Sequence, residues 1–168
     1  PLAWIVSAGP AEVCATLVPM RPVIGANDQV VALLGHFARS NPHVELLQRQ
    51  PEAAILFLGP HAYVSPSWMA DRTLAPTWNY VSVHCYGRPR VIEGDALGRH
   101  LAELVTMFEP PDGYSLERQP ADYLEKMRGA IVGFEMAIER VEGKRKLGQN
   151  RVREDRLGAA EALEASAD

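Results

Sequence analysis

The sequence has few of the features that define several common classes of protein. Only two cysteines occur among its 168 residues, Cys14 and Cys85. They lie far apart and outside any CxxC spacing, which argues against a structural zinc site. Both stand in apolar, strand-like stretches, so we expect reduced and buried thiols. No apolar run approaches the roughly 18 residues of a membrane span, and we expect a cytoplasmic protein.

The chain also lacks a surplus of positive charge. The net charge is −4 and the pI is near 5.8, whereas a domain that grips nucleic acid by its phosphates usually carries a basic surplus or a basic face. The exception is a cluster of cations within residues 144–156. Direct DNA binding by this chain alone is therefore disfavoured, although a dimer can still present a local basic patch.

Motifs of hydrolytic and metal-dependent catalysis are missing as well. The chain contains no nucleophile elbow, no P-loop and no HExxH. Its five histidines are His36, His43, His61, His84 and His100. None stands four residues from another, so metal-dependent catalysis has little support. We predict no metal site.

What remains is the composition of an ordinary globular domain. Hydrophobic residues make up 47% of the chain and charged residues 23%, which suits one compact domain with a real core. We therefore expect a single domain over residues 1–168, with a helical tail over about 150–168. The chain opens in strand-like sequence without a signal-peptide pattern, and we expect a further segment upstream of it.

The order of local patterns predicts strands first and helices inserted late. Apolar runs and polar–apolar alternation predict strands over 4–7, 12–20, 30–36, 53–58, 62–65, 77–92 and 131–141. Helices are expected from residue 41 to residue 51, over 95–108 and over 120–128. The tail has a thin apolar face, so we expect it to pack on a partner subunit or to fray. The pattern as a whole predicts an α+β protein built around a small antiparallel barrel.

The segment GHFARSNP, residues 35–42, is the most informative local feature. A strand ends in a tight turn that carries His36, Arg39, Ser40 and Asn41, and a helix starts directly after it. Free N–H groups at a helix start and the forked guanidinium of Arg39 suit the oxygens of a phosphate. The alternative is an ordinary capped helix with a surface arginine.

Two further segments are rich in side chains that bind cofactors. The aromatic and small polar residues of 62–68 and 75–80 include Tyr63, Ser65, Trp68, Thr77, Trp78 and Asn79. They can hold a planar ligand or form a packed core, and the residues alone leave both open. The basic segment 142–150 contains Lys144, Lys146, Gln149 and Asn150. These side chains can reach a phosphate or a ring carbonyl, or they can form a solvated basic loop.

Taken together, these segments resemble those of the PaiB family. The matching stretches are GHFARSNP (35–42), LGPHAYVSPSWM (58–69), PTWNYVSVHCYGRPRVI (76–92), ADYLEKMRGAIVG (121–133) and IVGFEMAIERVEGKRKLGQN (131–150). They follow the family's order with similar spacing and span most of the chain. The resemblance implies an FMN-binding split β-barrel, antiparallel and of the Greek-key type, with peripheral helices. It also implies a homodimer that binds FMN in a groove between its subunits, and a negative regulatory role in transcription.

The resemblance also implies roles for individual residues. In such barrels the phosphate lies beside a basic strand-to-helix turn, which makes Arg39, Ser40 and Asn41 the phosphate candidates, with His36 close by. Thr77, Trp78 and Asn79 match the segment near the ribityl chain or the flavin ring, and Tyr63, Ser65 and Trp68 belong to the neighbouring motif. Lys144, Lys146, Gln149 and Asn150 match a cationic strand end that a partner subunit can contribute.

This chain departs from the family in two places. Gly148 stands where the family commonly has Ser, and the loop 69–75 is shorter than usual. Three functions therefore stay open: an FMN-binding regulator or sensor, an FMN-dependent oxidoreductase, and a cofactor-free or haem-handling barrel. For the oxidoreductase, Tyr63, Trp68 and His84 can line a substrate pocket.

Overall fold

The computed structural model describes residues 1–166; residues 167–168, the end of the predicted tail, lie outside the described part. The chain divides into two compact units. Unit 1 comprises residues 1–56 and 85–141, and unit 2 comprises residues 57–84 and the chain from residue 142 onward. Each unit therefore combines segments that are far apart in the sequence.

The described strands form a five-stranded sheet with the order β2-β1-β5-β6-β9 and a four-stranded sheet with the order β3-β4-β8-β7. The first sheet contains β1 (Leu2–Ala8), β2 (Val13–Pro19), β5 (Ala53–Val64), β6 (Thr77–Gly87) and β9 (Arg140–Lys146). The second contains β3 (Arg21–Ile24), β4 (Val30–Ala38), β7 (Pro89–Ile92) and β8 (Ile131–Ala137). The pairs β1–β2, β1–β5, β3–β4, β4–β8 and β7–β8 are antiparallel. The predicted α+β class with antiparallel sheets is confirmed.

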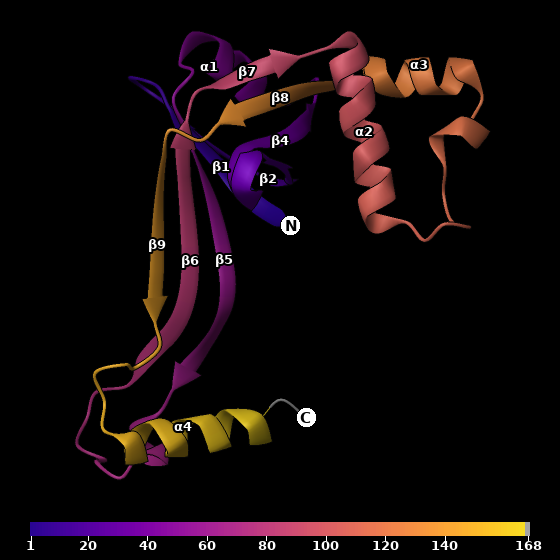
Figure 1. Ribbon diagram of the computed structural model, residues 1–168. Helices are drawn as coiled ribbons and strands as arrows, with labels where there is room; N and C mark the ends of the chain where they lie inside the picture. Colours follow the sequence, from indigo (N-terminus) through magenta and orange to yellow (C-terminus); the bar gives the residue numbers. More distant parts are fainter. Residues whose placement is uncertain (167–168) are drawn as a thin grey trace. The chain divides into compact units, whose positions relative to one another are not determined.

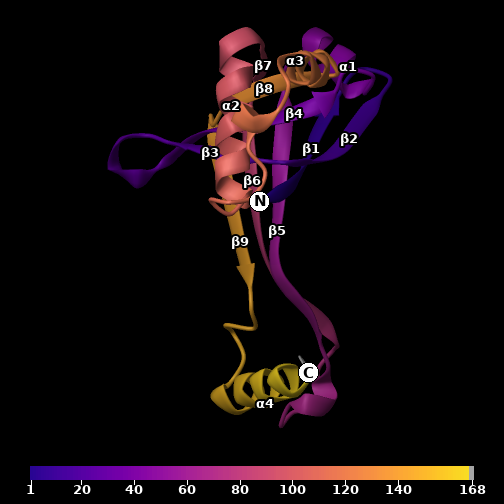
Figure 2. The same cartoon turned by 90° about the vertical axis from the view of Figure 1, so that its right-hand side faces the viewer.

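Helices follow the sequence prediction to within a few residues. They are α1 (His43–Arg49), α2 (Gly94–Phe108), α3 (Ala121–Gly129) and α4 (Arg153–Ala165), with short 3₁₀ turns η1 (Ala26–Asp28), η2 (Pro66–Trp68) and η3 (Leu116–Arg118). In unit 1, α2 and α3 lie beside each other (Figures 1 and 2). The loop between β3 and β4 extends away from its sheet (Figure 2).

The core of unit 1 explains the apolar character of its strands. In β1, Ala3, Ile5 and Ser7 are buried, while the alternate residues of a strand point to the opposite face. In the second sheet, the rings of Phe37 and Phe134 stack with their centroids 4.8 Å apart. The side chains that fill the core therefore come from both sheets.

Several strand boundaries differ from the prediction. Residues 53–58 and 62–64 belong to one continuous strand, β5, in which Gly59 and Pro60 do not interrupt the extended backbone, and Ser65 lies just beyond its end. The predicted strand 77–92 is two strands, β6 and β7, which belong to different sheets. The chain passes between the sheets at Gly87, where a Cβ atom would clash with the carbonyl oxygen of Ala137.

A similar break separates β8 from β9 within the predicted strand 131–141. The chain leaves β8 at Ala137 and starts β9 at Arg140. Between them, the Glu139 N–H donates to the Tyr86 carbonyl oxygen at 2.9 Å. The short strand β3 is not predicted at all, because its four residues, RPVI, include a proline and carry no alternation of polar and apolar residues.

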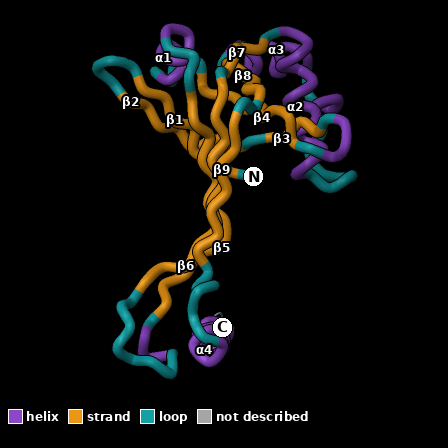
Figure 3. Tube along the Cα trace, turned by 60° about the vertical axis from the view of Figure 1, so that its left-hand side comes forward, coloured by secondary structure: helices purple, strands orange, loops and turns teal. Residues whose placement is uncertain are grey.

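The C-terminal helix docks within its own unit and does not fray over residues 153–165, whereas packing on a partner subunit stays a prediction. In unit 2, α4 lies beside the segment that joins β5 to β6 (Figure 3). Asp155 is 3% exposed, and its Oδ1 accepts hydrogen bonds from the N–H groups of Ala70 (3.0 Å) and Asp71 (3.2 Å). Gly158 lets the helix approach so closely that a Cβ atom there would clash with the carbonyl oxygen of Trp68. The apolar face of α4 is thin, so the hydrogen bonds to the buried carboxylate of Asp155 contribute to holding the helix in place.

Candidate functional site

Unit 2 carries a cluster of rings, which we call the aromatic surface: His61 and Tyr63 of β5, Trp68 of η2 and Trp78 of β6. The ring of Tyr63 lies edge-on to both tryptophans, with centroid distances of 6.3 Å to Trp68 and 6.1 Å to Trp78. The His61 ring lies 6.3 Å from that of Trp78. Trp78 is 54% exposed and Tyr63 is 43% exposed, so the surface can receive a planar ligand.

A lysine is fixed next to this surface. Lys146 ends β9, and its Nζ donates hydrogen bonds to Thr77 Oγ1 and to the carbonyl oxygen of Trp78, the latter at 3.0 Å. The Nζ atoms of Lys144 and Lys146 both lie 5.9 Å from the centroid of the Tyr80 ring. Because β9 is exposed along its whole length, these two lysines form a positive edge that an anion can reach. We call it the lysine edge.

The turn after β9 is closed by its own side chains. Gln149 accepts a hydrogen bond from the Leu147 N–H through Oε1 (2.9 Å) and donates from Nε2 to the Arg145 carbonyl oxygen (2.6 Å). Gly148 has a φ of +71°, a left-handed conformation that glycine adopts without steric cost. Glycine therefore suits the local backbone at this position. Asn150 lies exposed directly after Gln149.

A small cavity of about 150 Å³ lies in unit 2 under α4. Its polar lining consists of Thr77, Asn79, Arg151, Asp155 and Arg156. The sequence predicts Thr77 and Asn79 as site residues but not the two arginines. The sequence feature that could have indicated Arg151 and Arg156 is the basic stretch that continues to residue 156. Only the docking of α4 brings these arginines next to β6.

In unit 1, the corner formed by residues 38–43 has the expected strand–turn–helix form. Arg39 Nε donates to the carbonyl oxygen of Gly129 at 2.7 Å, and its Nη2 donates to that of Ile131 at 2.9 Å. Gly129 ends α3, and a cation is favoured at the negative end of a helix dipole. The guanidinium is thus oriented by the backbone, while its Nη1 makes no hydrogen bond within residues 1–166.

The other two residues of this corner differ in their surroundings. Asn41 Oδ1 accepts a hydrogen bond from the His43 N–H at 2.9 Å, and its Nδ2 donates to Thr16 Oγ1 at 3.4 Å. Its side chain therefore shapes the start of α1. Ser40 is exposed, so its hydroxyl is accessible to a ligand at this corner.

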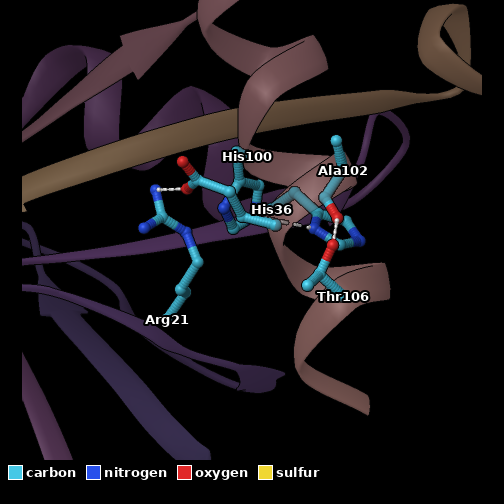
Figure 4. A network of polar contacts seen from close by, with 6 residues as sticks. Arg21, His36, His100, Ala102 and Thr106 are labelled. Carbon is cyan, nitrogen blue, oxygen red and sulfur yellow. Dashed lines mark hydrogen bonds and ion pairs between the residues drawn. The ribbon is translucent and has the colours of Figure 1, made fainter. Parts of the chain in front are cut away.

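His36 forms a pair with a second histidine in unit 1. Its Nδ1 lies 3.3 Å from Nε2 of His100, with the rings at 70° to each other. Beside the pair, Arg21 forms an ion pair with Glu103 at 2.7 Å (Figure 4). Burial lowers the pKa of His36. Burial, followed by the charges of His36 and Arg21, lowers the pKa of His100 to about 4, so both rings are neutral at pH 7.

The predicted site residues thus fall into two groups. Unit 2 contains Tyr63, Ser65, Trp68, Thr77, Trp78, Asn79, Lys144, Lys146, Gln149 and Asn150, and unit 1 contains His36, Arg39, Ser40 and Asn41. Ser65 accepts a hydrogen bond from the Ser67 N–H at 3.2 Å and caps η2. Rings and cations come together in unit 2, whereas Gln149, Asn41 and Ser65 stabilise local turns.

Residues 1–166 contain no group of three or more His, Cys, Asp or Glu side chains placed to hold a metal ion. Over the same residues, none of the helices has the length and apolar character that crossing a membrane requires.

Comparison with known proteins identifies relatives. The family model described as "Putative FMN-binding domain" matches residues 1–140. The chain is 34% identical over 134 residues to "Protease synthase and sporulation protein PAI 2" of Bacillus subtilis, a match that covers 79% of this chain and 64% of that protein. The chain thus spans less than two thirds of this relative's length. Together, the two matches confirm the resemblance to the PaiB family.

Solved structures share the fold. The FAD and heme binding protein from Mycobacterium smegmatis matches with a TM-score of 0.65 at 18% identity, covering 95% of this chain and 72% of that one. The flavocytochrome Anf3 from Azotobacter vinelandii matches with a TM-score of 0.64 at 18% identity, covering 88% of this chain and 63% of that one. These likenesses show a mixed α+β fold with antiparallel sheets like that of FMN-binding split-barrel proteins.

Proposed function

Because this chain belongs to the family described as "Putative FMN-binding domain", we propose that it binds FMN and works as a homodimeric, flavin-dependent sensor or regulator. FMN, when bound, supplies redox chemistry through its isoalloxazine ring, while the protein supplies binding, orientation and charge. The family match covers residues 1–140, which include Arg39, Tyr63 and Trp78 but not Lys144 or Lys146.

The observation that carries the proposal is the fixed position of Lys146 next to the aromatic surface. FMN combines a planar ring with an anionic phosphate, so a site for it needs ring faces or apolar walls and at least one cation. The hydrogen bonds from Lys146 to Thr77 Oγ1 and the Trp78 carbonyl oxygen hold one cation beside exposed rings. We propose that Trp78 and Tyr63 contact the flavin ring and that Lys144 and Lys146 attract the phosphate.

The corner at Arg39 is the second place that can take a phosphate. Nε and Nη2 of Arg39 already bind backbone carbonyl oxygens, and these fix the guanidinium so that Nη1 is left for an anion. The Ser40 hydroxyl is exposed next to it. We propose this corner as an alternative anion site within unit 1, and substitution distinguishes it from the lysine edge of unit 2.

The test is a titration of the protein with FMN, followed by quenching of flavin fluorescence. Losing one hydrogen bond to a charged group costs about 1.5–3 kcal/mol, which is roughly a 10- to 100-fold loss of affinity. We expect this loss for Lys146→Gln if the lysine edge takes the phosphate, and for Arg39→Ala if the corner does. Arg145→Gln removes an exposed charge from the same strand and serves as the matched control.

Failure of the unsubstituted protein to bind FMN at micromolar concentration would refute the proposal. Unchanged affinity in both Lys146→Gln and Arg39→Ala would remove both phosphate sites. Thermal unfolding of Arg39→Ala must be measured in parallel, because this variant also loses the contacts to the end of α3.

A homodimer is supported by an uncovered apolar face in unit 1. The residues of β1 that alternate with its buried ones include Leu2, 59% exposed, and Trp4, 47% exposed. Trp4 pairs with Leu17 across the hairpin, and Leu17 and Val13 are 43% and 71% exposed. Monomeric proteins rarely leave such a continuous apolar patch in water. We expect light scattering at micromolar concentration to give the mass of a dimer, and a monomer mass would refute this part.

The regulatory role is supported by similarity to a Bacillus subtilis relative whose name refers to sporulation. An oxidoreductase is the alternative, and an assay with NADH or NADPH separates the two. We expect bound FMN to change the stability or the oligomeric state of the protein without sustained turnover of the nicotinamide. Rapid, FMN-dependent oxidation of either nicotinamide would favour the enzyme.

A further inference from the structure

Unit 1 contains a pocket that the proposed FMN site does not use. It has a volume of about 490 Å³ and lies among α2, α3, η3 and the strand β4. Its walls are predominantly apolar and include Leu104, Phe108, Tyr123 and Met127. Pockets of this size and character bind small organic molecules with a few placed polar groups.

His36 supplies such a polar group, because it is one of the residues that line the pocket. Its Nδ1 is engaged with Nε2 of His100 at 3.3 Å, so Nε2 is the nitrogen left for a ligand. One of the two nitrogens in the pair must carry a hydrogen and the other a lone pair. Which one does so decides whether His36 offers a donor or an acceptor.

The buried environment of His100 settles this choice. His100 is 0% exposed, and its Nδ1 is buried without a hydrogen-bond partner. Proteins rarely leave a buried N–H without an acceptor, so Nδ1 of His100 carries the lone pair and Nε2 carries the hydrogen. His100 therefore donates to Nδ1 of His36. Since both rings are neutral, Nε2 of His36 is an N–H donor.

A carboxylate defines the second polar feature of the pocket. Glu109 lines it, and its Oε2 accepts a hydrogen bond from the Tyr114 N–H at 3.1 Å. Apart from neutral His36, the lining contains no side chain that can carry a positive charge. An anionic ligand would thus meet repulsion without a counter-charge, so this pocket is unsuited to the phosphate of FMN.

We propose that this pocket binds an uncharged aromatic carbonyl compound, whose ring packs among the apolar walls and whose carbonyl oxygen accepts a hydrogen bond from Nε2 of His36. The pocket shares no residue with the aromatic surface or the lysine edge, and the proposal does not depend on FMN binding. A carbonyl oxygen is the simplest acceptor on an otherwise apolar ring, and it matches one donor in an apolar environment.

Three naphthalenes of similar size test the proposal by isothermal titration calorimetry on the full chain. The probes are 2-acetylnaphthalene, 2-isopropylnaphthalene, which lacks the carbonyl oxygen, and 2-naphthoate, which adds a negative charge. We expect the ketone to bind about fivefold more tightly than the hydrocarbon, the usual worth of one neutral hydrogen bond. The carboxylate should bind most weakly.

Matched variants identify the groups responsible. His36→Phe keeps an aromatic ring but removes the N–H, and it should abolish the preference for the ketone. His36→Gln restores an N–H donor and should keep part of that preference. Glu109→Gln keeps an acceptor for the Tyr114 N–H and should improve binding of 2-naphthoate relative to the other probes.

Three results would overturn the proposal. The first is equal affinity of the unsubstituted protein for the ketone and the hydrocarbon, a comparison that needs no variant to fold. The second is an unchanged ketone preference in His36→Phe. The third is displacement of the ketone by FMN in direct competition, which would make this pocket part of the flavin site. If the unsubstituted protein does not bind FMN at all, the titration with the ketone still tests this proposal by itself.

Discussion

The same substitution, glycine to alanine, should have opposite effects in two helices of this protein. Gly158 lies inside α4 and Gly98 inside α2. Alanine is favoured over glycine in a helix interior by about 1 kcal/mol, so helix propensity alone predicts that both substitutions stabilise. Tertiary packing predicts that only Gly98→Ala does.

The difference lies in what each new methyl group meets. At Gly98 the Cβ would lie 3.6 Å from Nη2 of Arg128, an ordinary van der Waals contact with a flexible side chain. At Gly158 it would clash with the carbonyl oxygen of Trp68 and lie 3.3 Å from the carbonyl carbon. Because these atoms are backbone, α4 or η2 must move.

Such a movement would also lengthen the hydrogen bonds from the Ala70 and Asp71 N–H groups to Asp155. Overpacking costs roughly 1–3 kcal/mol. Lengthening the hydrogen bonds to Asp155 without breaking them adds about 1 kcal/mol, a fraction of the roughly 1.5–3 kcal/mol that losing a hydrogen bond to a charged group costs. After the gain of about 1 kcal/mol from propensity, we expect Gly158→Ala to destabilise unit 2 by about 1–3 kcal/mol. Gly98→Ala should stabilise by about 0.5–1 kcal/mol.

Hydrogen exchange measured by NMR is the direct assay, because it reports local opening for each amide. The amides of α4 and of Ala70 and Asp71 should lose about 5- to 150-fold in protection in Gly158→Ala, while amides of β4 and β8 stay unchanged. Urea unfolding followed by tryptophan fluorescence gives the accompanying change in midpoint. If Gly158→Ala raised protection in α4, as Gly98→Ala should in α2, the close approach of α4 to η2 would be refuted.

Three further predictions concern the polar groups of the two units. Asp155→Ala should destabilise unit 2 by about 2–4 kcal/mol, because two backbone N–H groups lose a charged acceptor; Glu161→Ala, an exposed acidic residue of the same helix, should change stability by less than about 0.5 kcal/mol in the same urea titration. Acid should destabilise the protein as the pH falls from 6.5 toward 4. The pKa of His100 is about 4 in the folded state against an ordinary value of 6.5, so the unfolded state binds the proton first. The free energy of unfolding should therefore fall by about 3 kcal/mol from its value above pH 6.5. His100→Gln should flatten that slope in urea titrations at several pH values, with the neighbouring His36, Arg21 and Glu103 unchanged; an equally steep slope would assign the acid sensitivity elsewhere. Gly148→Ala should cost about 1–2 kcal/mol because its φ of +71° is left-handed, and a thermal unfolding midpoint equal to that of the unsubstituted protein would contradict this.

Local features of the chain could be predicted because they depend on neighbouring residues. The helices α1, α2 and α3 and the strands β1 and β2 all appear near their predicted positions, since caps, prolines and apolar periodicity are encoded within a few residues. The motifs GHFARSNP, PTWNY and GKRKLGQN were sufficient to recognise the family. They could not show that Arg39 binds the end of α3, because Gly129 lies 90 positions away.

The tertiary structure decided how the polar groups are used. The sequence by itself determined the class of fold, the family and the set of cations, rings and histidines available for binding. Only the folded chain pairs His36 with His100, places Lys146 against Thr77 and Trp78, and buries Asp155 beneath the Ala70 and Asp71 amides. Each of these contacts joins residues at least 64 positions apart in the sequence. No local sequence pattern encodes such a contact, because the contact depends on how strands and helices pack.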